Sequence, residues 1–285
     1  MIWRCRDVTF ELDARVLVMG IVNVTPDSFS DGGRYLDPGA ALARCRELLA
    51  EGADVLDLGA ESTRPGSAAV PAGEQWRRLA PVLAGLAREH PAAVVSVDTR
   101  SAEVAERSLG AGARVVNDVS ALTDPAMAGV VSRAGAGLVL MHMRGTPETM
   151  QHDTVYADVT REVAGMLAGR LAAAAAAGVP GDRVALDPGI GFGKSAEGSL
   201  EILARLPELA ALGRPLLVGA SRKSFLARLT GDEGPPAGRV AASLAAAAIA
   251  VLHGAAILRV HDVAATVRAA KVALAARAAR RVAAG

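Results

Sequence analysis

A carboxylate ends a short apolar run in the stretch V-A-L-D-P-G-I-G-F-G-K, residues 184–194. Asp187 follows that run, and Pro188 and three alternating glycines come directly after it. A charge at the end of a buried strand is costly unless a partner satisfies it, and glycines let the backbone turn sharply and approach whatever lies above. Lys194 adds a cation at the end of the loop. Taken alone, this stretch supports a ligand site and a plain loop, with Asp187 capping the next helix, about equally.

The same design recurs along the chain, where eight apolar runs resemble strands. The runs are Val16–Val22, Val55–Leu58, Val94–Val97, Arg114–Val116, Leu138–Met141, Val184–Leu186, Pro215–Val218 and Ala256–Val260. Polar or ionisable residues stand at or just past the end of every run. They are Asn23, then Asp57 with E-S-T-R-P-G at 61–66, Asp98-Thr99-Arg100, Asn117-Asp118, His142, Asp187, Ser221-Arg222-Lys223-Ser224, and Arg259 with His261-Asp262.

Amphipathic helical stretches separate most of these runs. One begins at Asp37-Pro38, a cap followed by a first-turn proline, and closes at Gly52. Strands that alternate with helices indicate a parallel sheet, and eight of them favour a closed (β/α)8 barrel, for which ~250 residues is typical. Alternating residues 2–13 predict a short, lid-like hairpin before the barrel, and we expect one domain over residues 1–285. In a barrel the strand ends meet on one face, where active sites of this fold lie.

Composition excludes several classes of function. The 285 residues are 51% apolar and 21% charged, an ordinary balance for a soluble globular protein, and the net charge of +1 offers no attraction to nucleic acid or membranes. Cys5 and Cys45 form no disulfide framework or metal-binding spacing. The first seven residues lack the apolar core of a secretory signal, and Leu171–Ala177 and Val240–Leu252 are shorter than the roughly 18 apolar residues of a membrane span. We therefore expect a cytoplasmic protein.

Seven motifs match, in order, those of the dihydropteroate synthases, which this chain resembles from about Val16 to Val263. The motifs are N-V-T-P-D-S-F-S-D-G-G from Asn23, E-S-T-R-P-G from Glu61, S-V-D-T from Ser96, N-D-V-S from Asn117, D-P-G-I-G-F-G-K from Asp187, G-A-S-R-K-S from Gly219 and R-V-H-D from Arg259. The chain departs mildly from the family at Ala121-Leu122, past Asn117. The resemblance implies an eightfold barrel that joins 6-hydroxymethyl-7,8-dihydropterin pyrophosphate to p-aminobenzoate. It also implies a homodimer, with Val240–Leu252 as a candidate face.

The resemblance implies five pterin-binding residues: Asp98, Asn117, Met141, Asp187 and Lys223. Asp187 is an acceptor-only carboxylate that can take two adjacent N–H donors of the pterin. Lys223 can donate to the pterin carbonyl and a ring nitrogen, and Asn117 can both donate and accept. Two alternatives stay open, because Asp98 could instead cap the helix that starts near Ser101, and Met141 could simply pack in the core.

The leaving pyrophosphate needs a cradle of cations and hydrogen-bond donors. Arg259 and His261 lie two apart at a strand end and beside a helix start, a position that favours phosphate. Asn23 is expected to hold Mg²⁺ through oxygen, and Thr63 and Arg64 add donors. Stabilising the departing anion should dominate catalysis, which assigns catalytic roles to Asn23, Lys223, Arg259 and His261. A neutral core histidine remains the alternative for His261.

The p-aminobenzoate pocket implied by the resemblance contains Phe29, Pro65, Phe192 and Ser224. Two rival functions remain. A pterin-binding methyltransferase that acts on a corrinoid needs no pyrophosphate site, so the loops after the first and seventh strands disfavour it. A non-catalytic pterin-binding relative would be expected to lose Asn23, Arg64 or Arg259, and all three are present.

Overall fold

The computed structural model describes residues 1–25, 38–232 and 234–283. Its centre is a sheet of eight parallel strands in the order β8-β7-β6-β5-β4-β3-β10-β9, and a bridge between Leu186 and Leu216 joins its two edges. The strands are β3 (Leu17–Asn23), β4 (Val55–Gly59), β5 (Val94–Asp98), β6 (Val115–Asp118), β7 (Gly137–Met141), β8 (Val184–Asp187), β9 (Leu217–Val218) and β10 (Ile257–Val260). The predicted (β/α)8 barrel is confirmed.

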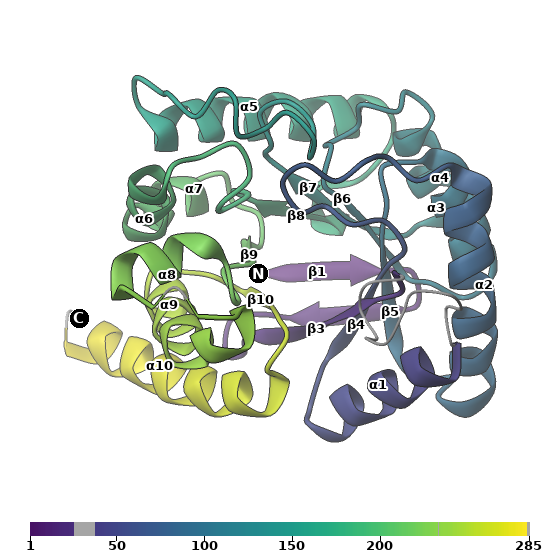
Figure 1. Cartoon of the computed structure of the whole chain (residues 1–285), viewed down its shortest axis with the longest axis horizontal. Helices are drawn as coiled ribbons and strands as arrows, with labels where there is room; N and C mark the ends of the chain where they lie inside the picture. The colour runs from purple at the N-terminus through teal and green to yellow at the C-terminus, as the bar shows by residue number, and fades with distance from the viewer. Residues whose placement is uncertain (26–37, 233, 284–285) are drawn as a thin grey trace.

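Helices form a ring around the strands (Figure 1). They are α1 (Pro38–Ala50), α2 (Ala72–Glu89), α3 (Ala102–Gly110), α4 (Met127–Ala134), α5 (Val159–Ala176), α6 (Ala196–Ala204), α7 (Leu206–Ala210), α8 (Ser224–Thr230), α9 (Val240–Leu252) and α10 (Val263–Ala283), with short turns η2 (Gly181–Arg183) and η3 (Pro236–Arg239). Each long helix turns one apolar stripe to the barrel; α2, for example, buries Leu79, Val82, Leu83 and Leu86 at helical spacing. Within the described part of the chain, no helix has the length and apolar character needed to cross a bilayer.

Strand side chains divide between two separate cores. On β4, Leu56 belongs to the core beneath the helices, whereas Val55 belongs to a smaller core inside the barrel. Because strand side chains alternate between faces, the residue two positions after an inner apolar residue also faces inward. This rule places polar side chains in the layer above the inner core, in the pairs Val55 and Asp57, Val115 and Asn117, Ala185 and Asp187, and Ile257 and Arg259.

The N-terminal hairpin closes the barrel at the starts of its strands. Its strands, β1 (Ile2–Cys5) and β2 (Val8–Glu11), are antiparallel and pair Trp3 with Phe10. Trp3 is fully buried in the inner core, and its indole Nε1 donates to the Arg183 carbonyl at 2.9 Å. The predicted hairpin is confirmed, but it is a floor beneath the inner core rather than a lid over the polar strand ends.

Trp3→Ala should therefore lower the free energy of unfolding by about 3–5 kcal/mol, the usual cost of truncating a buried tryptophan. Urea unfolding measures this loss, and Ile2→Ala, at an exposed position of the same strand, is the control. Activity per folded molecule should be unchanged, because the hairpin lies at the far end from the polar strand ends. A loss no larger than that of the control would show that the hairpin is not part of the core.

Candidate functional site

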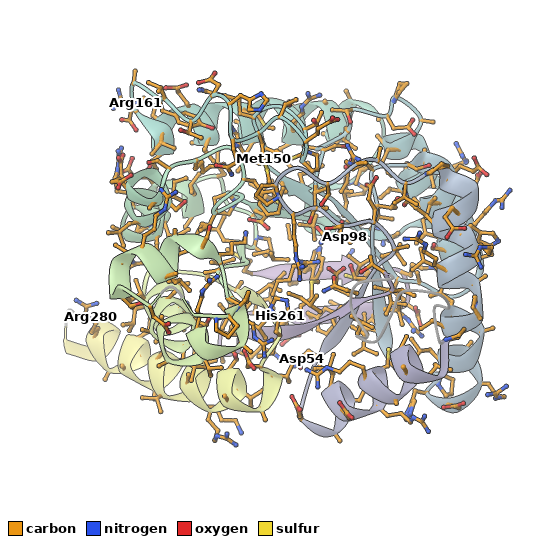
Figure 2. The ribbon with its side chains drawn as sticks, in the orientation of Figure 1. Asp54, Asp98, Met150, Arg161, His261 and Arg280 are labelled. Carbon is orange, nitrogen blue, oxygen red and sulfur yellow. The ribbon has the colours of Figure 1, made fainter. Side chains whose placement is uncertain are left out.

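A buried carboxylate, Asp57, lies at the centre of the polar layer. Its Oδ2 accepts hydrogen bonds from Arg259 Nε at 2.6 Å and Asn117 Nδ2 at 3.1 Å, and its Oδ1 accepts one from Ser96 Oγ at 2.6 Å. Arg259 also donates from its second terminal nitrogen to Asp98 Oδ2 at 2.8 Å. Figure 2 shows Asp98 inside the ring of helices. One guanidinium thus joins two buried carboxylates contributed by β4 and β5.

Asp98 lies among these charges and does not cap a helix. The cap of α3 is Ser101, and Asp124 accepts the Ala102 N–H at 2.8 Å, so the capping alternative is wrong. Burial raises the pKa of Asp98 to about 7, with Arg259 opposing the rise and Asp57 adding to it. Shifted pKa values of this kind are typical of functional sites.

Asp187 occupies the predicted place at the end of β8. It is almost completely buried, and its Oδ1 accepts the Gly189 N–H at 2.7 Å. Burial raises its pKa, and Lys223 is the main opposing influence. The cap of α6 is Ser195, whose side chain accepts the Gly198 N–H. Asp187 therefore caps no helix, and that part of the plain-loop interpretation is wrong.

The predicted pterin residues are neighbours across the barrel strands. Asp98 pairs in register with Asn117, and Met141 with Asp187. Asn117 is buried, and its Oδ1 has no hydrogen-bond partner among the residues that the structure describes. A buried acceptor left unpaired is costly, so this atom is a candidate partner for a ligand donor.

Lys223 reaches the same region from the loop after β9. Its Nζ lies 4.2 Å from the centre of the Phe192 ring, a cation–π contact, and donates to the Ile190 carbonyl. Burial lowers the pKa of Lys223 to about 7, opposed by Asp187. Lys223, predicted to bind the pterin, and Phe192, predicted to bind p-aminobenzoate, are thus in direct contact.

The side chain of His261 lies at the end of β10, beside Ser221. Its Nδ1 is 3.1 Å from Ser221 Oγ, and burial, followed by the charges of Arg222 and Arg259, lowers its pKa to about 4. The imidazole is therefore neutral at pH 7 in the unliganded protein. The neutral imidazole can still donate a hydrogen bond to an anion. The sequence predicted that both Arg259 and His261 act as cations, but only Arg259 carries a charge here.

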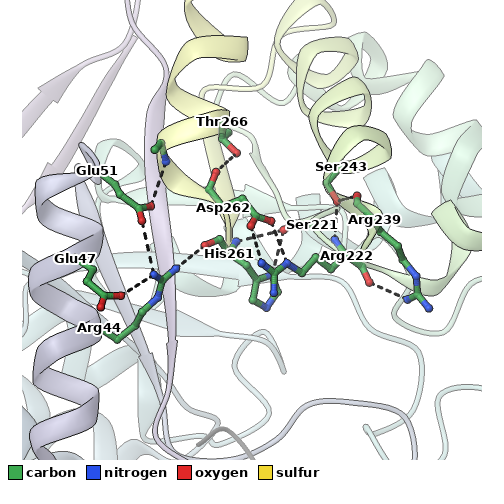
Figure 3. A network of polar contacts seen from close by, with 11 residues as sticks. Arg44, Glu47, Glu51, Ser221, Arg222, Arg239, Ser243, His261, Asp262 and Thr266 are labelled. Carbon is green, nitrogen blue, oxygen red and sulfur yellow. Dashed lines mark hydrogen bonds and ion pairs between the residues drawn. The ribbon is translucent and has the colours of Figure 1, made fainter. Parts of the chain in front are cut away.

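A polar network holds the loop after β9 against the end of β10 (Figure 3). Arg222 makes two hydrogen bonds to the Asp262 carboxylate, at 3.0 and 2.6 Å. Ser243 Oγ accepts the Arg222 N–H at 2.9 Å, and Arg239 donates to the Arg222 carbonyl at 3.1 Å. Arg222 has φ +60°, a conformation that is strained for a residue with a side chain. These contacts hold that backbone and so position Lys223.

The predicted metal ligand, Asn23, ends β3 beside Gly59 and Asp98. A Cβ built on Gly59 would lie 3.9 Å from Asn23 Oδ1 and 4.0 Å from Asp98 Oδ2, so both oxygens border the space above that glycine. Oxygen donors suit Mg²⁺. The described residues contain no group of three or more His, Cys, Asp or Glu side chains that could hold a metal, so an ion here would need ligands from substrate or water.

The remaining predicted residues lie on loops. Thr63, Arg64 and Pro65 follow β4, with Arg64 and Pro65 exposed, and Ser224 is the exposed first residue of α8. Phe29 lies outside the described residues, so its place is untested.

Three residues with evident roles were absent from the predicted site. Asp57 binds Arg259 and Asn117. It lies two residues after the inward-facing Val55 on β4, so strand alternation could have revealed that it also faces inward. Lys194 and His142 were the others. Lys194 turns inward instead of extending into the mouth of the barrel, and its Nζ lies 2.9 Å from His142 Nδ1.

Comparisons with known proteins identify the family of the chain. The model of the pterin binding enzyme family matches residues 19–261. Dihydropteroate synthase of Neisseria meningitidis serogroup C is 46% identical over 263 residues, 91% of this chain and 92% of the relative. The Escherichia coli K12 dihydropteroate synthase is 41% identical over 243 residues, 85% of each chain.

Solved structures give the same result. Xanthomonas albilineans dihydropteroate synthase with 4-aminobenzoic acid matches with TM-score 0.90 and 46% identity, covering 97% of this chain and 98% of that one. The same organism's enzyme in complex with 7,8-dihydropteroate matches with TM-score 0.86 and 44% identity, covering 98% and 99%. The chain therefore belongs to the pterin-binding enzyme family and, within it, to the dihydropteroate synthases.

Proposed function

We propose that this protein is a transferase that condenses 6-hydroxymethyl-7,8-dihydropterin pyrophosphate with p-aminobenzoate, giving 7,8-dihydropteroate and pyrophosphate. The observation that carries the proposal is the unpaired, buried Asn117 Oδ1, which lies one strand from Asp98 in a wall completed by Asp187 and Lys223. The relatives reported above, including a structure with bound 7,8-dihydropteroate, support it.

The pterin has adjacent N–H donors beside a carbonyl, and the wall offers the complementary groups. Asp187 accepts two N–H groups, and Asn117 Oδ1 takes a further amine hydrogen, which pairs the orphaned acceptor. Lys223 gives up its hydrogen bond to the Ile190 carbonyl and donates instead to the pterin carbonyl and a pterin ring nitrogen. Met141 packs against the ring, and Asp98 supplies a further acceptor.

In the reaction, the bond between the pterin methylene and the pyrophosphate oxygen breaks, and the amine lone pair of p-aminobenzoate forms the new C–N bond. The amine then loses a proton to solvent. Arg259, His261, Thr63 and Arg64 stabilise the charge on the leaving pyrophosphate, the main source of rate enhancement. Mg²⁺ at Asn23, when bound, would neutralise part of that phosphate charge.

p-Aminobenzoate is proposed to pack its ring against Phe192, with Pro65 and Phe29 as the other apolar residues of the pocket. Ser224 would donate a hydrogen bond to its carboxylate. We also propose a single-domain, cytoplasmic homodimer. Its candidate face is α9, a helix that is apolar except for Ser243 and that exposes the apolar side chain of Ile249.

Mixing both substrates with Mg²⁺ and measuring pyrophosphate release tests the function. Release should require p-aminobenzoate, should accompany formation of dihydropteroate, and should stop when a chelator removes the metal. Pterin binding without turnover would instead favour the non-catalytic relative. A methyl transfer that requires a corrinoid would favour the methyltransferase.

Asp187→Asn should abolish most pterin affinity while the barrel still folds. The amide has nearly the carboxylate's shape, but it replaces one acceptor with a donor that faces a pterin N–H. Charged hydrogen bonds contribute ~1.5–3 kcal/mol each, so we expect a loss of ~3–5 kcal/mol, on the order of a hundredfold to several thousandfold. Calorimetry and a melting curve measure the two quantities, with the exposed Asp153→Asn as the control. Unchanged affinity in a folded variant would refute the assigned site.

Pyrophosphate binding should draw a proton onto His261. The free imidazole has a pKa lowered to about 4 by burial and neighbouring arginines, and a bound anion must raise that pKa. A group whose pKa rises on binding strengthens binding as pH falls through the bound value. The ratio of wild-type to His261→Gln pyrophosphate affinity should therefore rise from about pH 8 to about pH 5. Taking the ratio cancels protonation of pyrophosphate itself, and a flat ratio would place His261 away from the anion.

A further inference from the structure

Lysine is rare in this chain, and its positions are informative. Of 31 lysine and arginine residues, only Lys194, Lys223 and Lys271 are lysines. Lys271 is exposed on α10, whereas the other two lie in the walls of the proposed site. An ammonium is compact and has three donors, whereas a guanidinium is a larger planar fork, so the two are not interchangeable in a tight space. The proposed reaction uses Lys223 and gives Lys194 no role.

Lys194 is a buried amine whose hydrogen-bonding capacity is fully used; burial lowers its pKa well below the usual value, and Asp187 opposes that shift. Its side chain is almost fully buried, and its Nζ lies 2.9 Å from each of three acceptors: the Gly189 carbonyl, the Phe192 carbonyl and His142 Nδ1. The His142 carbonyl lies 3.4 Å away as a fourth, more distant acceptor, so the amine has at least as many partners as hydrogens. Burial, followed by the charge of Lys194, lowers the pKa of His142 to about 3, so its imidazole is neutral.

The loop that Lys194 closes depends on side chains for its order. Each carbonyl from residue 189 to residue 193 accepts a side-chain hydrogen bond, from Lys194, Lys223, Gln151, Lys194 and Tyr156 in turn. Its three glycines have φ values of +65°, +80° and +63°, and glycine has little backbone preference of its own. The donors, rather than local propensity, therefore select this conformation.

The same loop carries two proposed ligand contacts. The Gly189 N–H donates to Asp187 Oδ1, and the Phe192 ring lies under Lys223 Nζ. The loop also lies directly against the segment after β7, since a Cβ on Gly189 would come within 1.9 Å of the His142 carbonyl oxygen. Releasing the loop from Lys194 must therefore move the groups that face the pterin.

We propose that Lys194, held by His142, is a positioning residue for pterin recognition: it touches no substrate but fixes the 189–193 loop, so that the Gly189 N–H holds Asp187 and the Phe192 ring holds Lys223 in place for the pterin. This inference rests on the proposed function. A purely structural role for Lys194 would instead lower stability and the active fraction, and would leave the KM for the pterin substrate unchanged.

Lys194→Met keeps the length of the side chain and removes every hydrogen bond of the amine. We expect it to raise the KM for the pterin pyrophosphate at least about tenfold, equivalent to about 1.4 kcal/mol. The KM for p-aminobenzoate should change less, within about threefold, because only one of its proposed pocket residues, Phe192, lies on this loop. Binding of the pterin pyrophosphate by calorimetry should weaken by the same factor. Lys271→Met, at the exposed lysine, is the matched control and should match wild type in both constants.

Tyr156→Phe is a milder second variant, because it removes only the 2.8 Å hydrogen bond to the Gly193 carbonyl from a half-buried side chain. It should raise the pterin KM about threefold, again with a smaller effect on that for p-aminobenzoate. The inference is overturned if folded Lys194→Met keeps the wild-type pterin KM, or if Lys194→Met does not fold and Tyr156→Phe changes nothing. Wild-type protein without turnover would instead refute the proposed function, so the two failures are distinguishable.

Discussion

The ion pair between Asp57 and Arg259 is the constraint on which the rest of the site depends. Burying charges costs several kcal/mol per ion, and attraction offsets that cost only when the geometry is good and the remaining polar atoms are bonded. Here Ser96 and Asn117 donate further hydrogen bonds to the Asp57 carboxylate. The same guanidinium also donates to Asp98. The orientation of Arg259, the proposed anion ligand, is therefore fixed before any substrate arrives.

The barrel separates stability from chemistry along its axis. Its lower layer and the hairpin form an apolar core, while the polar layer begins two residues further along the same strands. A short step along a strand thus changes an inward position from packing to binding. The apolar layer supplies the burial that makes the charged layer tolerable, and loops after the strands can vary without disturbing it.

Two ionisable groups of the polar layer have pKa values close to neutral pH. Burial brings the pKa of Lys223 down to about 7 and that of Asp98 up to about 7, while His261 is left uncharged by a pKa lowered to about 4. A dianionic or more highly charged ligand entering such a site redistributes protons as it binds. Clustering of shifted groups in this way is typical of functional sites, and it makes binding and protonation one linked process.

Local pattern determined much of this protein, because alternation along strands and capping and turn residues act over a few positions. The eight strands, the hairpin and the polar residues at the strand ends follow from it, and the motif residues Asp187, Asn117 and Lys223 lie where the sequence predicts. Only the tertiary structure decided which charges meet. Asp57 and Arg259 are 202 residues apart. Lys194 meets His142, which is 52 residues away along the chain and follows the neighbouring strand. The low pKa of His261 arises from burial that no single segment encodes. Partners and dielectric environment depend on closure of the whole barrel, and therefore lie beyond any local pattern.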